Sequence, residues 1–568
     1  MPVADHTVHP ARGEHGRVNP LLRHLHPVPS PLPYCKRWPR RCQPRRGYFD
    51  TLVRKMSLFF LPPVVYNKIV LGFDPENPTG NHQQEAFRLT ASEKQKLGEQ
   101  LDRWIPTIRE EFLRDVSKLC RIRSVSEAKD EFVPGDKPYG EGCYQVLMEA
   151  LKMAGEYGFR TKNYENYAGS ATYGENPQDD AIAIVPHMDI VPEGDGWTCE
   201  PFEPHISEDG KYIFGRGTAD NKAPGVMALY AMRFLKEHGI KLKNNVMIVF
   251  GMSEETGSID MPAFLAREKA PKWCLVPDAK YPVGYAEKGM VRSKFASYPV
   301  GEELVDIWGG DVVNSVPDKA YAVLGGVSLE EVKEKFGGFE RISVEADARG
   351  VRVNATGTSH HCARPHGAIN ANDVLVKALL GSGLVGGRTR DALEVISVLT
   401  GDYDGVPLGI EAEDDVSGKL TFVLSMLRKE GDRIILQPDI RYPVKMDQEF
   451  LMKQIPVYFE KAGFEIVKLH NDPALYIPLD NPVIQKLIEV AREQLGQPDI
   501  PPLVLDGGTY ARSLPNAVSY GATVPGRVRL FGMEKGGAHQ ADEYGDIAHL
   551  LLNIKVYVNA LLEIDPLV

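Results

Sequence analysis

The first long pattern of apolar and polar positions is that of an amphipathic helix. Between Thr90 and Cys120, apolar residues recur at helical spacing. They are Leu97, Leu101, Trp104, Ile105, Ile108, Phe112, Val116 and Leu119. Thr90 or Ser92 stands where a helix cap is favoured, and Pro106 predicts a kink. We therefore expect a packed helix over this range.

Two short apolar runs further along are typical of buried strands. Ala181–Val185 runs into His187, and Val246–Phe250 runs into a turn that contains Glu254. Between them, Pro224–His238 has helical periodicity, and this alternation predicts a mostly parallel sheet covered by helices. Ligands of such sheets bind beyond the carboxyl ends of the strands, which is where His187 and Glu254 fall.

After about Glu287 the pattern changes to shorter elements separated by glycines, which predicts an α+β module. Its clearest stretches are 341–355, 419–430, 439–444 and a helical pattern at 448–462. The chain then returns to a helix at Pro482–Leu495 and a strand near Leu503.

Composition places the chain among globular proteins and argues against nucleic acid as a partner. Its 568 residues suffice for two or more domains, and 43% are hydrophobic and 25% charged. The formal charge of −11 would repel a polyanion, and the one basic cluster lies in the first fifty residues. Residues 1–55 are rich in Pro, Arg and His, so we expect a disordered tail, and a true start at Met56 is a simple alternative.

The cysteines and the apolar runs favour a cytoplasmic protein. Seven cysteines stand singly, without a CxxC pair, which fits a reducing compartment. The apolar run Leu58–Phe73 is interrupted by Pro62, Pro63, Asn67 and Lys68 and is shorter than the roughly 20 residues of a spanning helix. We therefore expect no membrane segment, and a secretory signal is disfavoured.

Polar residues of the metal-ligand type follow the buried strands or lie in glycine-rich turns. They are His187 with Asp189, Asp220, the pair Glu254 and Glu255, Asp278, and His539. Each alone is compatible with a structural histidine or a solvated carboxylate. Together they offer the imidazoles and carboxylates that two divalent ions about 3.5–4 Å apart require, with one carboxylate left as a general base.

The strings around these residues resemble the M20 metallopeptidase family, and within it the PepV-like, Xaa-His dipeptidase branch. The strings are Pro-His-Met-Asp, Gly-Arg-Gly-Thr-Ala-Asp, Ser-Glu-Glu-Thr-Gly, Val-Pro-Asp, Asn-Ser-Val-Pro-Asp and Gly-Gly-Ala-His-Gln-Ala-Asp-Glu. The resemblance implies that Asp220 bridges two metal ions. It assigns His187 and Asp278 to one ion, and Glu255 and His539 to the other.

The same resemblance implies the catalytic roles. Glu254 is the general base, and Asp189 orients His187 through its second ring nitrogen. His361 stabilises the tetrahedral oxyanion, although His360 beside it is a rival. The chain departs from the family pattern after Asp220, where Asn-Lys-Ala replaces the usual Asp-Lys-Gly, and at the Cys-Ala that follows His361.

The resemblance also predicts a fold, a mixed or mostly parallel α/β catalytic domain interrupted by an α+β lid domain. The expected ranges are 90–287 and 475–568 for the catalytic domain and 288–474 for the lid. Substrate would contact Asn314 and Arg441 of the lid, with a surface salt bridge as the alternative role of Arg441. The remaining contacts would come from a glycine-rich loop with Gly507, Gly508 and Thr509.

The predicted activity is hydrolysis of dipeptides by a dinuclear metal centre holding Zn²⁺, with Mn²⁺ or Co²⁺ as alternatives. An N-acyl amino acid deacylase of the aminoacylase or desuccinylase type would use the same centre. An inactive binding module with this fold is the alternative of a different class.

Overall fold

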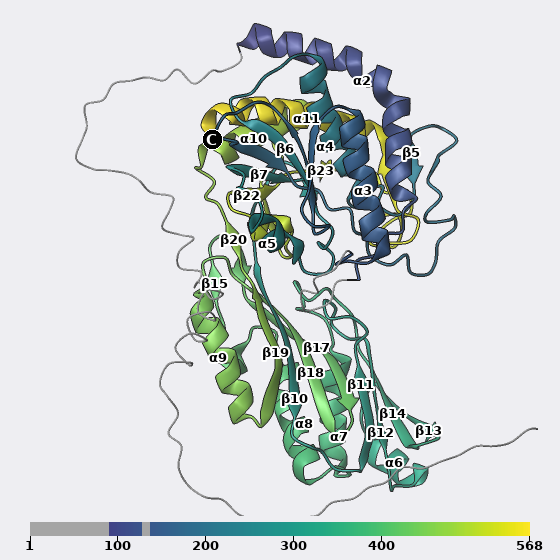
Figure 1. Ribbon diagram of the computed structural model, residues 1–568. Coiled ribbons are helices and arrows are strands. Elements are labelled where there is room, and N and C mark those ends of the chain that lie inside the picture. The colour runs from purple at the N-terminus through teal and green to yellow at the C-terminus, as the bar shows by residue number, and fades with distance from the viewer. Residues whose placement is uncertain (1–89, 128–136) are drawn as a thin grey trace, which may run out of the picture. The chain divides into compact units, whose positions relative to one another are not determined.

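The computed structural model describes residues 90–127 and 137–568 (Figure 1). The predicted tail, 1–55, and the apolar run Leu58–Phe73 lie outside the described residues. Helix α2 spans Ala91–Cys120 and confirms the helix predicted from the apolar spacing. Thr90 and Glu93 form a capping box at its start, and Pro106 lies within it.

A mixed sheet forms the core of the part of the chain that carries the predicted metal ligands. The strand order is β1-β2-β6-β3-β7-β22-β9-β20, with β21 paired to β9. The bounds are β1 Arg160–Asn163, β2 Gly169–Tyr173, β3 Ala181–Ile184, β6 Asn245–Phe250, β7 Trp273–Val276, β9 Gly284–Glu287, β20 Leu475–Tyr476, β21 Leu503–Leu505 and β22 Ala517–Ser519. Residues from both sides of the 288–474 range therefore build one sheet.

The central strands of this sheet run parallel, and its outer pairs are antiparallel except for β21, which pairs in parallel with β9. β3 pairs in parallel with β6 and β7, and β7 with β22. β2 pairs antiparallel with β6, and β9 antiparallel with β22 and β20. The sheet is thus mixed. The sequence could not distinguish a mixed from a mostly parallel sheet, because the outer strands are short and their apolar pattern does not reveal their direction.

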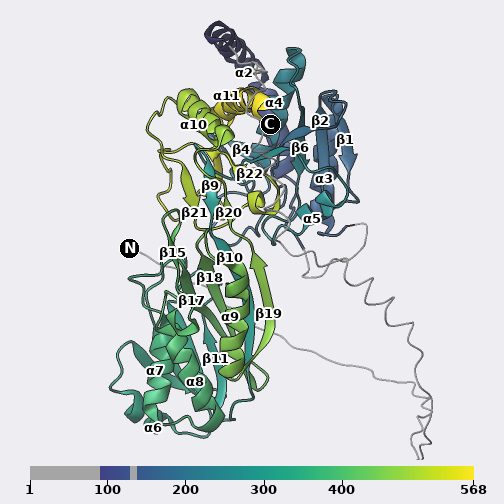
Figure 2. The same cartoon turned by 90° about the vertical axis from the view of Figure 1, so that its left-hand side faces the viewer.

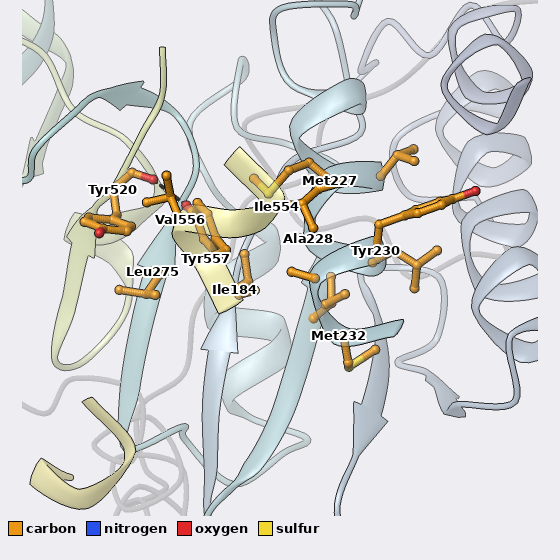
Figure 3. Packing of buried hydrophobic residues seen from close by; sticks show 14 of the residues in the cluster. Ile184, Met227, Ala228, Tyr230, Met232, Leu275, Tyr520, Ile554, Val556 and Tyr557 are labelled. Carbon is orange, nitrogen blue, oxygen red and sulfur yellow. Dashed lines mark hydrogen bonds between the residues drawn. The ribbon is translucent and has the colours of Figure 1, made fainter. Parts of the chain in front are cut away.

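Alternating residues of the central strands face two separate cores. Ile182 and Ile184 lie in the larger cluster with helices α2, α4 and α11, whereas Ala181 and Ala183 pack on the opposite face. Figure 3 shows Ile184 and Leu275 in the larger cluster, near Tyr557 of α11. The helices of the larger cluster are α3 Glu141–Glu156, α4 Lys222–Glu237, α10 Pro482–Leu495 and α11 Ile547–Ile564, and the other face carries α5 Asp260–Leu265 and the 3₁₀ turn η3 Tyr510–Ser513.

Helix α11 was not singled out from the sequence. The stretch Ile547–Leu567 is long and apolar enough to satisfy a test for a membrane span, and most of it is buried inside the protein. It packs against α4 and α10. Its apolar character is therefore that of a core helix.

A second, entirely antiparallel sheet lies within the 288–474 range (Figures 1 and 2). Its order is β13-β14-β12-β11-β17-β18-β10-β19, and its helices share one hydrophobic cluster with it. The bounds are β10 Gly289–Ser297, β11 Leu304–Gly309, β12 Lys319–Leu324, β13 Ile342–Asp347, β14 Gly350–Thr356, β17 Thr421–Glu430, β18 Arg433–Tyr442, β19 Phe464–Asp472, α6 Leu329–Phe336, α7 Ala371–Ser382, α8 Gly387–Thr400 and α9 Gln448–Lys461. This is the predicted α+β module.

Short elements complete the described chain. They are β4 His205–Ile206, β5 Tyr212–Phe214 and β24 Tyr544–Asp546 in one small sheet, the pairs β8 Ala279–Lys280 with β23 Ala522–Thr523 and β15 Glu413–Asp414 with β16 Gly418–Lys419, and the 3₁₀ turns η2 Val406–Leu408 and η4 Asp565–Leu567.

Candidate metal centre and substrate site

Three neighbouring strands of the first sheet end at the same edge, and each is followed by a predicted metal ligand. His187 comes after β3, Glu254 and Glu255 after β6, and Asp278 after β7. Because these strands are parallel neighbours, their carboxyl ends meet. Asp220 arrives from the residues just before α4 and completes a cluster.

His187 lies at the centre of this cluster and is almost fully buried. Its Nε2 is 2.9 Å from Oδ1 of Asp220 and 3.8 Å from Oδ2 of Asp278. Its Nδ1 faces the backbone oxygen of Asp189 at 3.0 Å and the carboxylate of Asp189 at 3.4 Å. A neutral His187 with its proton on Nδ1 would present its Nε2 lone pair to a cation held between the ring and these carboxylates.

The second histidine comes from the far end of the chain. His539 Nε2 is 3.1 Å from Oδ2 of Asp220 and 3.0 Å from Oε1 of Glu255. Asp220 thus has one oxygen toward each histidine. The backbone of His539 is in the left-handed region, with φ of 63°, and half of its side chain is exposed.

Two groups of side chains bring their ligand atoms within 4.8 Å of one another. One is His187, Glu254 and Asp278, and the other is His187, Asp220 and Glu255. The structure therefore assembles all of the predicted metal ligands and the predicted base in one place. Within the first group, the carboxylate of Glu254 lies as close to the side chains of His187 and Asp278 as a metal ligand would.

Asp189 acts on the neighbouring turn as well as on His187. Its two carboxylate oxygens accept the backbone N–H groups of Glu254, at 3.2 Å, and Glu255, at 3.1 Å. Asp189 has no exposed surface. Asp189 therefore fixes the turn through the backbone N–H groups of both glutamates. The side chains of Glu254 and Glu255 are not used for this and can act at the cluster.

The electrostatics of the cluster favour bound cations. Burial and the charge of Asp278 raise the pKa of Glu254 well above its usual value, and burial and the charge of Asp220 do the same for Asp278. Burial lowers the pKa of His187, but hydrogen bonds to Asp189 and Asp220 together with the charges of Asp220 and Asp278 outweigh it and raise the pKa above its usual value. Buried carboxylates that repel one another in this way fit divalent cations, which would offset their charges.

Arg441 is buried rather than part of a surface salt bridge, so the surface alternative is wrong. Its Nε and Nη2 donate to the two oxygens of Asp439, at 2.9 and 3.1 Å, and Nη1 donates to the backbone oxygen of Asp506 at 2.8 Å. A guanidinium has five N–H groups, so two remain, one on each terminal nitrogen. These two suit the carboxylate of a ligand.

His361 lies in the electrostatic neighbourhood of Arg441. Burial first, and then the positive charge of Arg441, lower the pKa of His361. Asn314 adjoins this segment, because its backbone oxygen accepts the N–H of Cys362 at 2.9 Å. Arg364 forms an ion pair with Asp506 at 3.3 Å. Asn314, His361 and Arg441 therefore belong to one region, and among the described residues no hydrogen bond or ion pair joins them to the metal-ligand cluster.

The glycine-rich loop is held by a buried glutamate at the end of β9. Glu287 accepts the N–H of Thr509 at 3.0 Å and its hydroxyl at 2.8 Å, and it contacts Arg512 at 3.4 Å. A side chain at Gly508 would meet the guanidinium of Arg512 at 1.7 Å. Glycine is required at this position because Arg512 is itself held by Glu287. A Cβ added at the neighbouring Gly507 would lie 3.9 Å from Nη1 of Arg441.

Sequence reasoning missed the buried acids that hold these loops, which are Glu287, Asp439 and Glu543. Each is fully or almost fully buried and accepts several hydrogen bonds. The only signal in the sequence is an acidic residue within an apolar or glycine-rich string. That signal does not identify the donor, which comes from a distant segment.

Comparison with known proteins agrees with the geometry. Residues 183–563 match the peptidase family M20/M25/M40. A Bacillus subtilis (strain 168) protein named "Putative dipeptidase YtjP" is 34% identical over 471 residues, covering 80% of this chain and 97% of that protein. Beta-Ala-Xaa dipeptidase of Lactobacillus delbrueckii subsp. lactis is 30% identical over 465 residues, covering 80% and 96%. The structure of human carnosine dipeptidase 1 is 15% identical, with a TM-score of 0.47 over 83% of this chain and 98% of that one.

The family match includes every predicted metal ligand, and the relatives are matched over almost their whole length. The chain therefore belongs to the M20/M25/M40 peptidase family, a family of metal-dependent hydrolases.

Proposed function

We propose that this protein is a dipeptidase that uses two divalent metal ions, with Zn²⁺ as the working ion and Mn²⁺ or Co²⁺ as alternatives. The observation that carries the proposal is the cluster of two histidines and four carboxylates at the ends of β3, β6 and β7. Two of the relatives are named as dipeptidases, which supports the choice of substrate.

In this proposal five side chains hold the ions. Asp220 would be shared by both ions because its two oxygens face different histidines, at 2.9 and 3.1 Å. His187 and Asp278 would complete one site, and Glu255 and His539 would complete the other. When bound, the ions supply an activated water and polarise the substrate carbonyl.

Glu254 is the general base. Its carboxylate lies in the cluster with His187 and Asp278, and its raised pKa suits a group that accepts a proton and then returns it. It takes the proton from the attacking water and donates it to the amine that leaves. Asp189 keeps the turn in place while Glu254 gains and loses its charge.

The substrate's free carboxylate binds at Arg441 and Asn314. The buried ion pair with Asp439 fixes the plane of the guanidinium, so its two remaining N–H groups are oriented before substrate arrives. His361, in the same region, stabilises the negative oxygen of the tetrahedral intermediate. Gly507, Gly508 and Thr509 line the path of the substrate backbone.

Binding of the substrate carboxylate at Arg441 and Asn314 selects substrates by their length. If the carboxylate is held one residue beyond the bond that is cut, a dipeptide satisfies both ends of the site. A longer peptide places a peptide bond where the carboxylate belongs, so the two N–H groups of Arg441 that Asp439 and Asp506 leave available would have no anionic acceptor. We therefore expect dipeptides to be preferred over tripeptides.

The test is hydrolysis of a panel of dipeptides, one tripeptide and N-acetyl amino acids by protein stripped of metal and then supplied with Zn²⁺, Mn²⁺ or Co²⁺. The proposal expects cleavage of dipeptides that depends on added metal. Cleavage of the N-acetyl amino acids alone would identify a deacylase. Failure to bind two ions would indicate an inactive binding module.

A further inference from the structure

A single buried carboxylate organises the loop that presents Asp220. Glu543 has no exposed surface. Its Oε1 accepts three N–H groups of this loop, from Gly217 at 3.0 Å, Ala219 at 2.9 Å and Asp220 itself at 3.1 Å. Three donors that converge on one anionic oxygen fix the backbone of the loop, and so the position from which the Asp220 side chain starts.

The same residue belongs to the turn that carries His539. Glu543 follows His539 by four residues, and its backbone oxygen accepts the N–H of Gly215 at 3.0 Å. The loop of Asp220 and the turn of His539 are therefore joined through both the side chain and the backbone of one residue. The two side chains they present meet at 3.1 Å.

The second oxygen of Glu543 extends the network to a third segment. Oε2 accepts from Nη1 of Arg216 at 2.7 Å, and both side chains are buried. Arg216 also donates to the backbone oxygens of Pro192, at 3.4 Å, and Glu193, at 3.2 Å, and lies over the ring of Trp197. Arg216 thus supplies the positive charge that allows a carboxylate to remain ionised in this interior.

We propose that Glu543 is a positioning residue of the metal centre: it sets the separation of Asp220 and His539 through the loop N–H groups, and so controls metal affinity. The inference rests on the proposed metal-binding function. A simpler role, in which Glu543 only neutralises Arg216, would make it a core ion pair with no specific effect on metal.

The two roles are separated by Glu543→Gln with Asp542→Asn as a matched control. Asp542 is also buried, in the same turn, but it accepts from Thr198 N at 2.6 Å and Lys535 at 3.1 Å instead of from the Asp220 loop. An amide at position 543 keeps the size of the side chain. It loses the charge that attracts three donors, and it presents an N–H group to Arg216 if its oxygen stays with the loop.

Two measurements are made without substrate. The first is hydrogen exchange of peptides that cover 215–221 in metal-free protein, where E543Q is expected to exchange at least about tenfold faster and D542N to match wild type. The second is the affinity for Zn²⁺ in competition with a chelator, where E543Q is expected to lose about 10–100-fold and D542N less than about threefold.

Zinc affinity in E543Q equal to that of D542N would overturn the proposal and leave the ion-pair role. If E543Q does not fold, Glu543→Asp serves instead, because it keeps the charge for Arg216 but is too short to reach all three N–H groups. A wild-type affinity in E543D would likewise overturn the proposal. Absence of metal binding by wild-type protein would instead remove the proposed function itself.

Discussion

Replacing Glu254 by glutamine removes the proposed base and spares the proposed metal ligands. The two side chains have nearly the same size. The turn is held by the N–H groups of Glu254 and Glu255, which donate to Asp189 and remain in the variant. We therefore expect Glu254→Gln to fold, to bind the same number of ions and to lose most of its activity.

The size of the loss follows from the role of the carboxylate. General acid–base catalysis typically contributes about 10²–10⁴-fold, or about 2.7–5.4 kcal/mol at 1.36 kcal/mol per tenfold. Glu254 would act both on the water and on the leaving amine, and burial with the charge of Asp278 raises its pKa well above its usual value. We expect kcat to fall toward the upper end of that range, with little change in KM.

The assay is the initial rate of dipeptide hydrolysis, followed by chromatography of the released amino acids, beside metal content by mass spectrometry. Glu268→Gln is a control in the same domain, since Glu268 contacts Lys162 and Tyr164, each at 2.7 Å, rather than the cluster. Activity of E254Q within tenfold of wild type at full metal content would refute the assignment. Loss of one ion together with activity would show that Glu254 is a ligand.

Three further outcomes are expected. The hydrogen bonds to Asp220 and Glu255 raise the pKa of His539 to about 11 in the metal-free protein, so metal binding must release protons and metal affinity must rise with pH. Calorimetry in buffers of different ionisation heat measures the released protons, and a metal affinity that does not depend on pH would contradict the expectation. Arg441→Lys cannot keep Asp439 and bind a substrate carboxylate bidentately, so KM for dipeptides should rise at least about tenfold while kcat changes less, and an unchanged KM would count against binding of the substrate carboxylate at Arg441. Ile554→Ala should lower the free energy of unfolding by about 2–5 kcal/mol in chemical denaturation because Ile554 is fully buried in the larger core, and a loss below about 1 kcal/mol would contradict that packing.

The sequence predicted the ends of strands well because two signals coincide there. Ala181–Ile184 and, from Val246 on, the strand Asn245–Phe250 are uninterrupted apolar runs, as is typical of strands buried on both faces, and His187 and Glu254 follow within four residues. A carboxylate or imidazole just after a buried strand is favoured where a ligand binds, because ligands of such sheets bind beyond the carboxyl ends of the strands. The candidates that follow strands could therefore be proposed from the pattern alone, whereas the assignment of all five ligands, Asp220 and His539 included, came from the family resemblance.

The remaining features depend on partners that are distant in sequence. Glu287 and Glu543 each bind the N–H groups of loops more than two hundred residues away, and local pattern does not encode that pairing. The buried ion pair of Arg441 with Asp439 was missed for another reason. Two charged residues on one face of a strand are typical of an exposed face, and only the packed structure shows that this face is covered.

The interrupted first sheet has a consequence for the order in which the protein is made. While the ribosome is still adding the 288–474 range, β7 lacks its neighbour β22, and the apolar face of α4 lacks α11. The nascent chain must keep this unfinished surface from aggregating until its last residues emerge. His539 also arrives late, so the proposed metal centre would be complete only when synthesis is nearly finished, and C-terminal truncation should give an insoluble protein rather than a weaker enzyme.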